Sequence, residues 1–112
     1  MEFNSFQTFE HDSISAGSTV SGSWTADDDY IIRKIYIVEK TGATINASTL
    51  YFKVGGDVYT HEFVSAKILG PQQNVTPLLD IEITKGEKFD YTFKNNESSA
   101  VSIFIVLELW KK

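Results

Sequence analysis

Apolar and polar side chains alternate along most of this chain, and no stretch repeats its apolar positions with the 3.6-residue period of a helix. A period of two places successive side chains on opposite faces of an extended strand. Residues 79–83 show it clearly, because Leu79, Ile81 and Ile83 alternate with Asp80 and Glu82. The pattern therefore predicts an all-β protein.

Eight strands are expected, separated by Gly, Asp, Asn, Ser and Pro clusters that are typical of turns. Their ranges are 3–9, 19–26, 30–39, 49–54, 58–64, 78–84, 88–94 and 100–110. In the first strand we expect Phe3 and Phe9 on one face, with Phe6 breaking the alternation, and residues 11–17 as a turn-rich connection. A chain of 112 residues suits a single domain, here residues 1–112.

The connections favour an eight-stranded antiparallel jelly-roll sandwich. Only Gly55-Gly56-Asp57 has the composition of a tight hairpin, whereas residues 11–17, 41–48 and 70–77 are long enough to cross between two sheets. In a jelly roll the fourth and fifth strands are the consecutive pair that lies side by side, and here the glycine turn joins them. Immunoglobulin-like and up-and-down arrangements remain open.

The third and eighth strands differ from the others because both of their faces are apolar, although a sandwich strand needs only one apolar face. In a jelly roll these two strands are neighbours at the centre of one sheet. Strict alternation places the following outward residues in one patch: Ile31, Ile35, Ile37, Phe104, Val106 and Trp110. An exposed apolar patch usually marks an interface, so we expect a homo-oligomer; the alternative is that another segment of the same chain covers it.

Charge and composition exclude several classes of protein. The formal net charge is −5 and Lys and Arg form no cluster, so direct nucleic-acid binding is not expected. There is no cysteine, and the N-terminus lacks the charged and apolar regions of a signal peptide. The most apolar run, residues 101–110, is half of the ~20 residues that a spanning helix needs. A soluble protein with no membrane span and no export is expected.

The sequence predicts no enzyme, no cofactor and no metal site. Its two histidines, His11 and His61, are fifty residues apart and are expected at the surface, and no nucleophile motif occurs. The run Asp27-Asp28-Asp29 could bind calcium through its carboxylates, but a solvated turn explains it more simply.

Exposed aromatic side chains offer a second functional class, a carbohydrate- or receptor-binding module that stacks sugars. The candidates are Trp24, Tyr51, Tyr59 and Trp110. Trp24 alternates in step with Val20 and is better explained as a core residue. Trp110 could instead anchor an interface, because tryptophan is enriched at binding hot spots.

Four segments together resemble single jelly-roll structural proteins of bacterial and archaeal virus particles. They are residues 18–26 (Ser-Thr-Val-Ser-Gly-Ser-Trp-Thr-Ala), 30–38, 81–87 (Ile-Glu-Ile-Thr-Lys-Gly-Glu) and the terminal strand to Trp110. The resemblance implies a capsid or appendage subunit, assembled in the host cytoplasm into a virion with copies of itself and other virion proteins. Capsid proteins that package nucleic acid often carry a basic arm, and this N-terminus has none.

Overall fold

The computed structural model describes residues 2–43, 45–58, 64–65 and 80–112. These residues form strands and no helix, and so include none that could cross a membrane. The strands are β1 (Glu2–Ile14), β2 (Thr19–Thr25), β3 (Tyr30–Glu39), β4 (Thr49–Val54), β5 (Asp57–Val58), β6 (Val64–Ser65), β7 (Ile81–Ile83), β8 (Lys88–Lys94) and β9 (Val101–Lys111). The predicted bounds of β3, β4 and β8 are confirmed, whereas the predicted count of eight strands is not.

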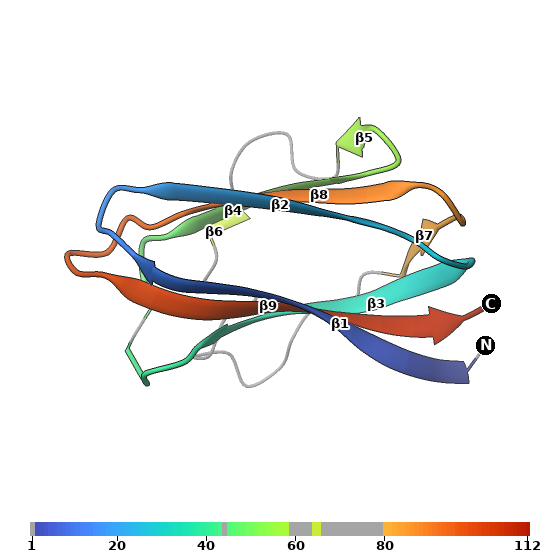
Figure 1. The fold of residues 1–112 in the computed structure, drawn as a ribbon, viewed down its shortest axis with the longest axis horizontal. Coiled ribbons are helices and arrows are strands. Elements are labelled where there is room, and N and C mark those ends of the chain that lie inside the picture. Colours follow the sequence, from blue (N-terminus) through green and yellow to red (C-terminus); the bar gives the residue numbers. More distant parts are fainter. Residues whose placement is uncertain (1, 44, 59–63, 66–79) are drawn as a thin grey trace.

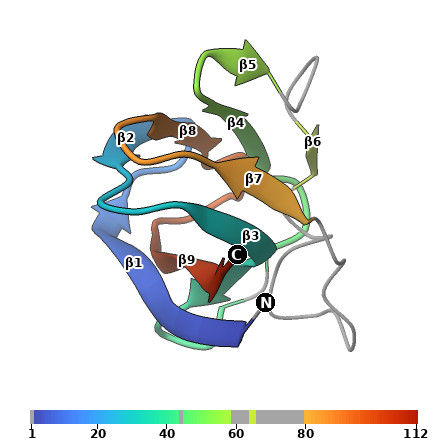
Figure 2. The same cartoon turned by 90° about the vertical axis from the view of Figure 1, so that its right-hand side faces the viewer.

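The strands form two antiparallel sheets that lie face to face (Figures 1 and 2). One sheet has the order β1-β9-β3-β7 and the other β2-β8-β4-β5, with β6 also paired to β4. β5 pairs with one end of β4 and β6 with the other end. The prediction of an all-β protein with two sheets is therefore confirmed, while most of residues 58–64 and all of residues 70–77 lie outside the described part of the chain.

The core lies between the sheets and takes every second side chain of the long strands, as the alternation predicts. β9 contributes Val101, Ile103, Ile105, Leu107 and Leu109, and β8 contributes Phe89, Tyr91 and Phe93. Aromatic rings join the two sheets: the ring centroids of Phe9 on β1 and Phe89 on β8 are 6.1 Å apart. Trp24 packs against this core, which confirms its predicted place.

The hairpin between β4 and β5 is confirmed. Lys53 pairs with Val58 and Val54 with Asp57, so the loop consists of Gly55 and Gly56. Their φ angles are 59° and 88°, and a two-residue loop with both φ positive suits the twist of antiparallel strands. Glycine accepts these angles without a steric cost.

β1 extends further than predicted, because residues 11–14 continue the strand. Ile14 pairs with Val101 and is buried, so its side chain holds the end of β1 in the core. The register shifts between His11 and Ile14, where Ser13 has a φ of 52°. The turn that was expected at 11–17 begins only after Ile14.

Two carboxylates hold the connection between β3 and β4, at one end of the sandwich. Glu39 is only 6% exposed and accepts hydrogen bonds from the backbone N–H groups of Thr41, Ala43 and Ser102 and from the Thr41 hydroxyl. Glu97 accepts from three successive backbone N–H groups, at residues 46–48. The backbone N–H groups of Thr41, Ala43 and residues 46–48 are therefore paired by side chains rather than by a neighbouring strand.

Candidate functional site

The outward side of the β1-β9-β3-β7 sheet, here called the outer face, is built differently from the prediction because β3 contains a bulge. Ile32 pairs with Leu109 and Lys34 with Glu108, which leaves Arg33 as an extra residue. An extra residue moves every later side chain of the strand to the opposite face.

Because of this bulge, two predicted interface residues do not lie on the outer face. Ile35 is 0% exposed and Ile37 is 1% exposed, so both belong to the core. Tyr36 and Val38 take the outward positions instead. Their outward direction follows from their pairing with Val106 and Phe104.

The remaining predicted residues do lie on the outer face. Phe104, Val106 and Trp110 are half-buried and alternate with the core side chains of β9. Ile31 pairs with Trp110 and is also half-buried. Their role in a subunit interface stays a prediction.

β1 adds two aromatic side chains that the sequence interpretation missed. Phe3 pairs with Trp110 and Ser5 with Leu109, so Asn4 is an extra residue and Phe3 points outward together with Phe6. The polar residues Ser5 and Gln7 take the inner positions. Phe3, Phe6 and Val38, the exposed large hydrophobic residues of the described chain, are 47%, 57% and 43% exposed, and all lie on the outer face. The broken alternation at Phe6 was the signal for this arrangement.

On β1, β9 and β3, in that order, the outer face has four rows of side chains. The pairings define them as Phe3-Trp110-Ile31, Phe6-Glu108-Lys34, Thr8-Val106-Tyr36 and Glu10-Phe104-Val38. Successive rows are two residues apart along the strand, or ~7 Å. The first row is apolar throughout, and the third has short side chains on β1 and β9.

The first two rows carry an aromatic cluster, defined as Phe3, Phe6 and Trp110. The ring centroids of Phe3 and Phe6 are 5.2 Å apart, and those of Phe3 and Trp110 are 6.0 Å apart in an edge arrangement. Arg33 lies over the Trp110 ring, with Cζ 4.9 Å from the centroid. Trp and Arg with packed aromatic rings have the composition of an interface hot spot.

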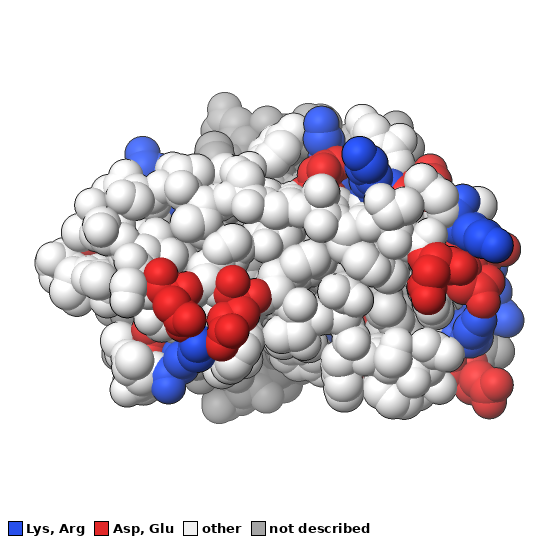
Figure 3. Space-filling model, viewed as in Figure 1, with Lys and Arg blue, Asp and Glu red and all other residues white. Residues whose placement is uncertain are grey.

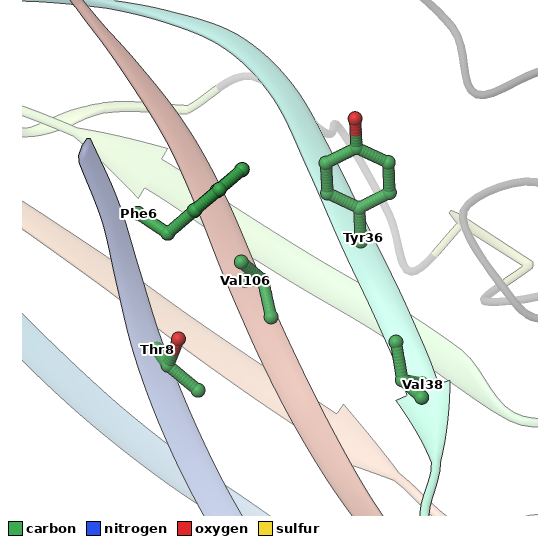
Figure 4. A pocket seen from close by; sticks show the side chains of 5 residues that line it. All are labelled: Phe6, Thr8, Tyr36, Val38 and Val106. Atoms are coloured by element: carbon green, nitrogen blue, oxygen red, sulfur yellow. The ribbon is translucent and has the colours of Figure 1, made fainter. Parts of the chain in front are cut away.

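An open hollow of about 340 Å³ lies next to this cluster and is lined by Phe6, Thr8, Tyr36, Val38 and Val106. Figure 4 shows how it arises: Phe6 and Thr8 project from β1, Tyr36 and Val38 from β3, and the short Val106 from β9 between them. The outer face thus has a raised aromatic part and a lower part beside it.

Glu108 holds the aromatic side chains around it in place. Its carboxylate accepts a 2.7 Å hydrogen bond from the Tyr36 hydroxyl and a 2.8 Å hydrogen bond from Trp110 Nε1. Burial raises the pKa of Tyr36 to about 12, with the bond to Glu108 as the second cause. Burial also raises the pKa of Glu108, but these hydrogen bonds and the positive charges of Lys34 and Arg33 outweigh it and keep the pKa below its ordinary value. Glu108 is therefore charged at neutral pH.

Charges at the borders of the outer face are paired with one another. Lys40 pairs with Glu10 and Asp12 at one end, and Lys112 with Glu82 at the other. On the side of the molecule formed by the edge strands β1 and β2, charged side chains lie left of the centre, along the upper edge and at the right-hand end of the view, and the surface between these groups is uncharged (Figure 3). Glu10, Asp12 and Glu82, three of the acidic groups of this sheet, thus each have a lysine partner.

The other candidates have structural partners. Asp27 accepts from the Tyr30 hydroxyl, Asp28 pairs with Lys111, and Asp29 accepts from the backbone N–H of Lys85. His11 was expected at the surface but is half-buried, with Nε2 2.6 Å from the Tyr91 hydroxyl. Within the described ranges, no three His, Asp or Glu residues are grouped so that they could hold a metal ion. His61 and Tyr59 lie outside those ranges.

Comparison with protein-family models, with curated proteins and with solved structures finds no match to this chain. The function is therefore argued from the outer face itself.

Proposed function

We propose that this protein is a structural subunit of a virus particle and that it self-assembles through the outer face. The observation that carries the proposal is the position of Phe3, Phe6 and Val38, which are each more than two-fifths exposed and lie on one sheet. A contiguous exposed apolar patch is rare on a monomer and usually marks an interaction site.

The strand order supports a jelly-roll classification. If β5 and β6 are taken as two parts of one interrupted strand, the first sheet has the order first-eighth-third-sixth and the second the order second-seventh-fourth-fifth. This is the order of a jelly roll. Since one fold serves many functions, the fold alone supports a virion role less strongly than the outer face supports assembly.

The proposal assigns the chain no catalytic role and no cofactor. It also assigns no direct contact with nucleic acid, since binding to phosphates requires an excess of basic groups and the net charge is −5. Its partners are copies of itself and other virion proteins.

The test is the molar mass of the purified protein by light scattering over a concentration series, for the wild type and for Val106→Asp. Val106 lies in the middle of the outer face, so its charged variant should remain folded and lose association. Ile35→Asp does not serve, because Ile35 is in the core and its variant would unfold. Thr19→Asp, an exposed position in β2 on the other sheet and opposite Lys94, is the control and should associate like the wild type.

A wild type that stays monomeric at every concentration would refute self-assembly. An assembly that survives Val106→Asp would refute the outer face as its interface.

The hollow favours a second candidate, a carbohydrate- or receptor-binding module. Tyr36 and Phe6 offer ring surfaces on which a sugar could stack, and Glu108 orders the neighbouring Trp110. A glycan array would detect such binding, which should be lost in Tyr36→Ala and in Trp110→Ala. An array without any bound glycan would count against this candidate.

A further inference from the structure

We infer that two copies of this chain pack face to face through the outer face. Their two-fold axis lies in the interface and runs perpendicular to the strands, between the row of Glu108 and the row of Val106. The inference rests on the proposed self-assembly and names its arrangement. Its basis is that the outer face carries both a raised part and a hollow. In a two-fold interface the raised part of each copy can meet the hollow of the other copy.

A two-fold interface uses the same patch on both copies, so each raised feature must meet a lower feature of the same face. Rotation about the stated axis keeps each strand over its own copy and reverses the order of the four rows. The second row then lies over the third, which places Phe6 over the partner's Thr8 and beside its Val106, at the hollow.

The same rotation places the first row over the fourth. Trp110 then faces Phe104 of the partner, and Ile31 faces Val38 of the partner. Val38 is 43% exposed, so the arrangement covers one of the three exposed hydrophobic side chains directly. Sheets that pack face to face with their strands nearly aligned form a common type of interface.

The alternative two-fold axis runs along the strands and fits less well. It keeps each row over itself and exchanges β1 with β3, so that Phe6 would lie over Lys34 of the partner. Each Glu108 would also lie over Glu108 of the partner, so that two carboxylates would face each other, and Tyr36 rather than Phe6 would lie over the partner's Thr8 at the hollow. The axis across the strands keeps the two Glu108 carboxylates in different rows and places each Phe6 at the partner's hollow, and Lys34 faces the ring of the partner's Tyr36, which attracts an ammonium group.

The charges of the outer face are compatible with a second copy. The Glu108 carboxylate is already hydrogen-bonded to Tyr36 and Trp110, and Lys40 is paired with Glu10 and Asp12. Two chains of net charge −5 repel each other, and the cations that lie beside the acidic groups of this face, Lys34 and Arg33 near Glu108 and Lys40 near Glu10, lower that repulsion where the chains meet.

The test is a charge exchange between Ile31 and Val38. In one chain these residues are three rows, or ~20 Å, apart, so charges placed on them cannot pair within that chain. Across the inferred axis they face each other. We would measure the dimer dissociation constant by sedimentation equilibrium for Ile31→Lys, Val38→Glu, the double variant with both changes, and Ile31→Lys with Val38→Lys as the matched control.

Each single variant should weaken association at least tenfold, because a charge then meets an apolar side chain of the partner. The Lys-Glu double variant should recover to within about threefold of the wild type, and 1 M salt should abolish that recovery, since salt screens the new pairs. The Lys-Lys variant should stay monomeric. Circular dichroism and melting temperature would establish that all four variants are folded.

If both single variants weaken association and the Lys-Glu variant is no tighter than either, the two-fold arrangement is wrong while self-assembly through the outer face stands. If the wild type does not associate, the proposed function fails as well. Unchanged association in all four variants would overturn both the arrangement and the choice of the outer face.

Discussion

Glu39→Gln should destabilise the protein substantially, although it removes no atom from the side chain's outline. The Glu39 carboxylate is 6% exposed and accepts four hydrogen bonds. Three of them reach Oε1, from the Thr41 backbone, the Thr41 hydroxyl and the Ala43 backbone, and the fourth reaches Oε2 from the Ser102 backbone. A glutamine offers one acceptor oxygen, and its amide N–H₂ would meet a donor at one of these positions.

The magnitude follows from the donors left without a partner. If the glutamine oxygen takes the place of Oε1, the Ser102 N–H faces the amide and loses its acceptor, which costs ~1–3 kcal/mol for a buried group. The other three bonds change from charge-assisted to neutral and weaken, although a neutral side chain is easier to bury. Together we expect a loss of about 3 kcal/mol of unfolding free energy, equivalent to a decrease of ~10–15 °C in melting temperature for a domain of this size.

The assay is urea denaturation followed by circular dichroism, with the free energy extrapolated to water. Glu82→Gln is the control, because Glu82 is exposed and its ionic partner among the described residues is Lys112 at the surface. It should change the stability by less than ~0.5 kcal/mol.

The dependence of stability on pH provides an independent check on Glu39. Burial raises the pKa of Glu39, but the hydrogen bonds from Thr41, Ser102 and Ala43 outweigh it and hold the pKa below its ordinary value of 4.5. The carboxylate's contribution is therefore complete above pH 4.5 and is lost as the pH falls through the lower pKa of the folded state. The stability gap between wild type and Glu39→Gln should narrow over that range. A gap below 0.5 kcal/mol at neutral pH, or one that does not depend on pH, would refute this account of Glu39.

Three further predictions concern packing, the bulge and acid stability. Gly22→Ala should destabilise the protein by ~1–3 kcal/mol, because a Cβ there would lie 2.3 Å from the buried Tyr91 hydroxyl; urea denaturation with a loss under 0.5 kcal/mol would contradict it. Ile35→Ala should cost ~2–4 kcal/mol in the same assay and Val38→Ala under ~0.5 kcal/mol, and equal losses would argue against the bulge at Arg33. Burial raises the pKa of Glu97, but its hydrogen bonds outweigh burial and hold the pKa below 4.5. The wild-type urea midpoint should therefore fall as the pH drops below 4.5, and in Glu97→Gln this fall should be smaller. The same dependence of the urea midpoint on pH in both proteins would contradict the role of Glu97.

Much of the fold was readable from the sequence because the alternation of side chains along a strand is a local property. The alternation predicted the bounds of β3, β4 and β8. The pair Gly55-Gly56 predicted the β4–β5 hairpin, because glycine readily adopts the positive φ angles that such a turn requires. The core residues of β8 and β9 followed directly from the same alternation.

The candidate site was predicted only in part. Ile31, Phe104, Val106 and Trp110 were placed on the outer face correctly, but Ile35 and Ile37 belong to the core, and Phe3 and Phe6 were missed. The errors at Ile35, Ile37 and Phe3 have one cause. An extra residue in a strand reverses the faces of the positions beyond it, and strict alternation cannot reveal where that residue lies.

The sequence by itself determined that this chain forms strands and which side chains can fill a core, since both depend on neighbouring residues. Only the tertiary structure decided where the bulges at Asn4 and Arg33 fall, because a bulge exists only relative to the partner strand, which here is β9 in both cases. It likewise decided that Glu39 and Glu97 face backbone N–H groups up to 63 residues away along the chain. These features depend on contacts between distant segments, and they set the composition of the outer face and the stability of the end of the sandwich.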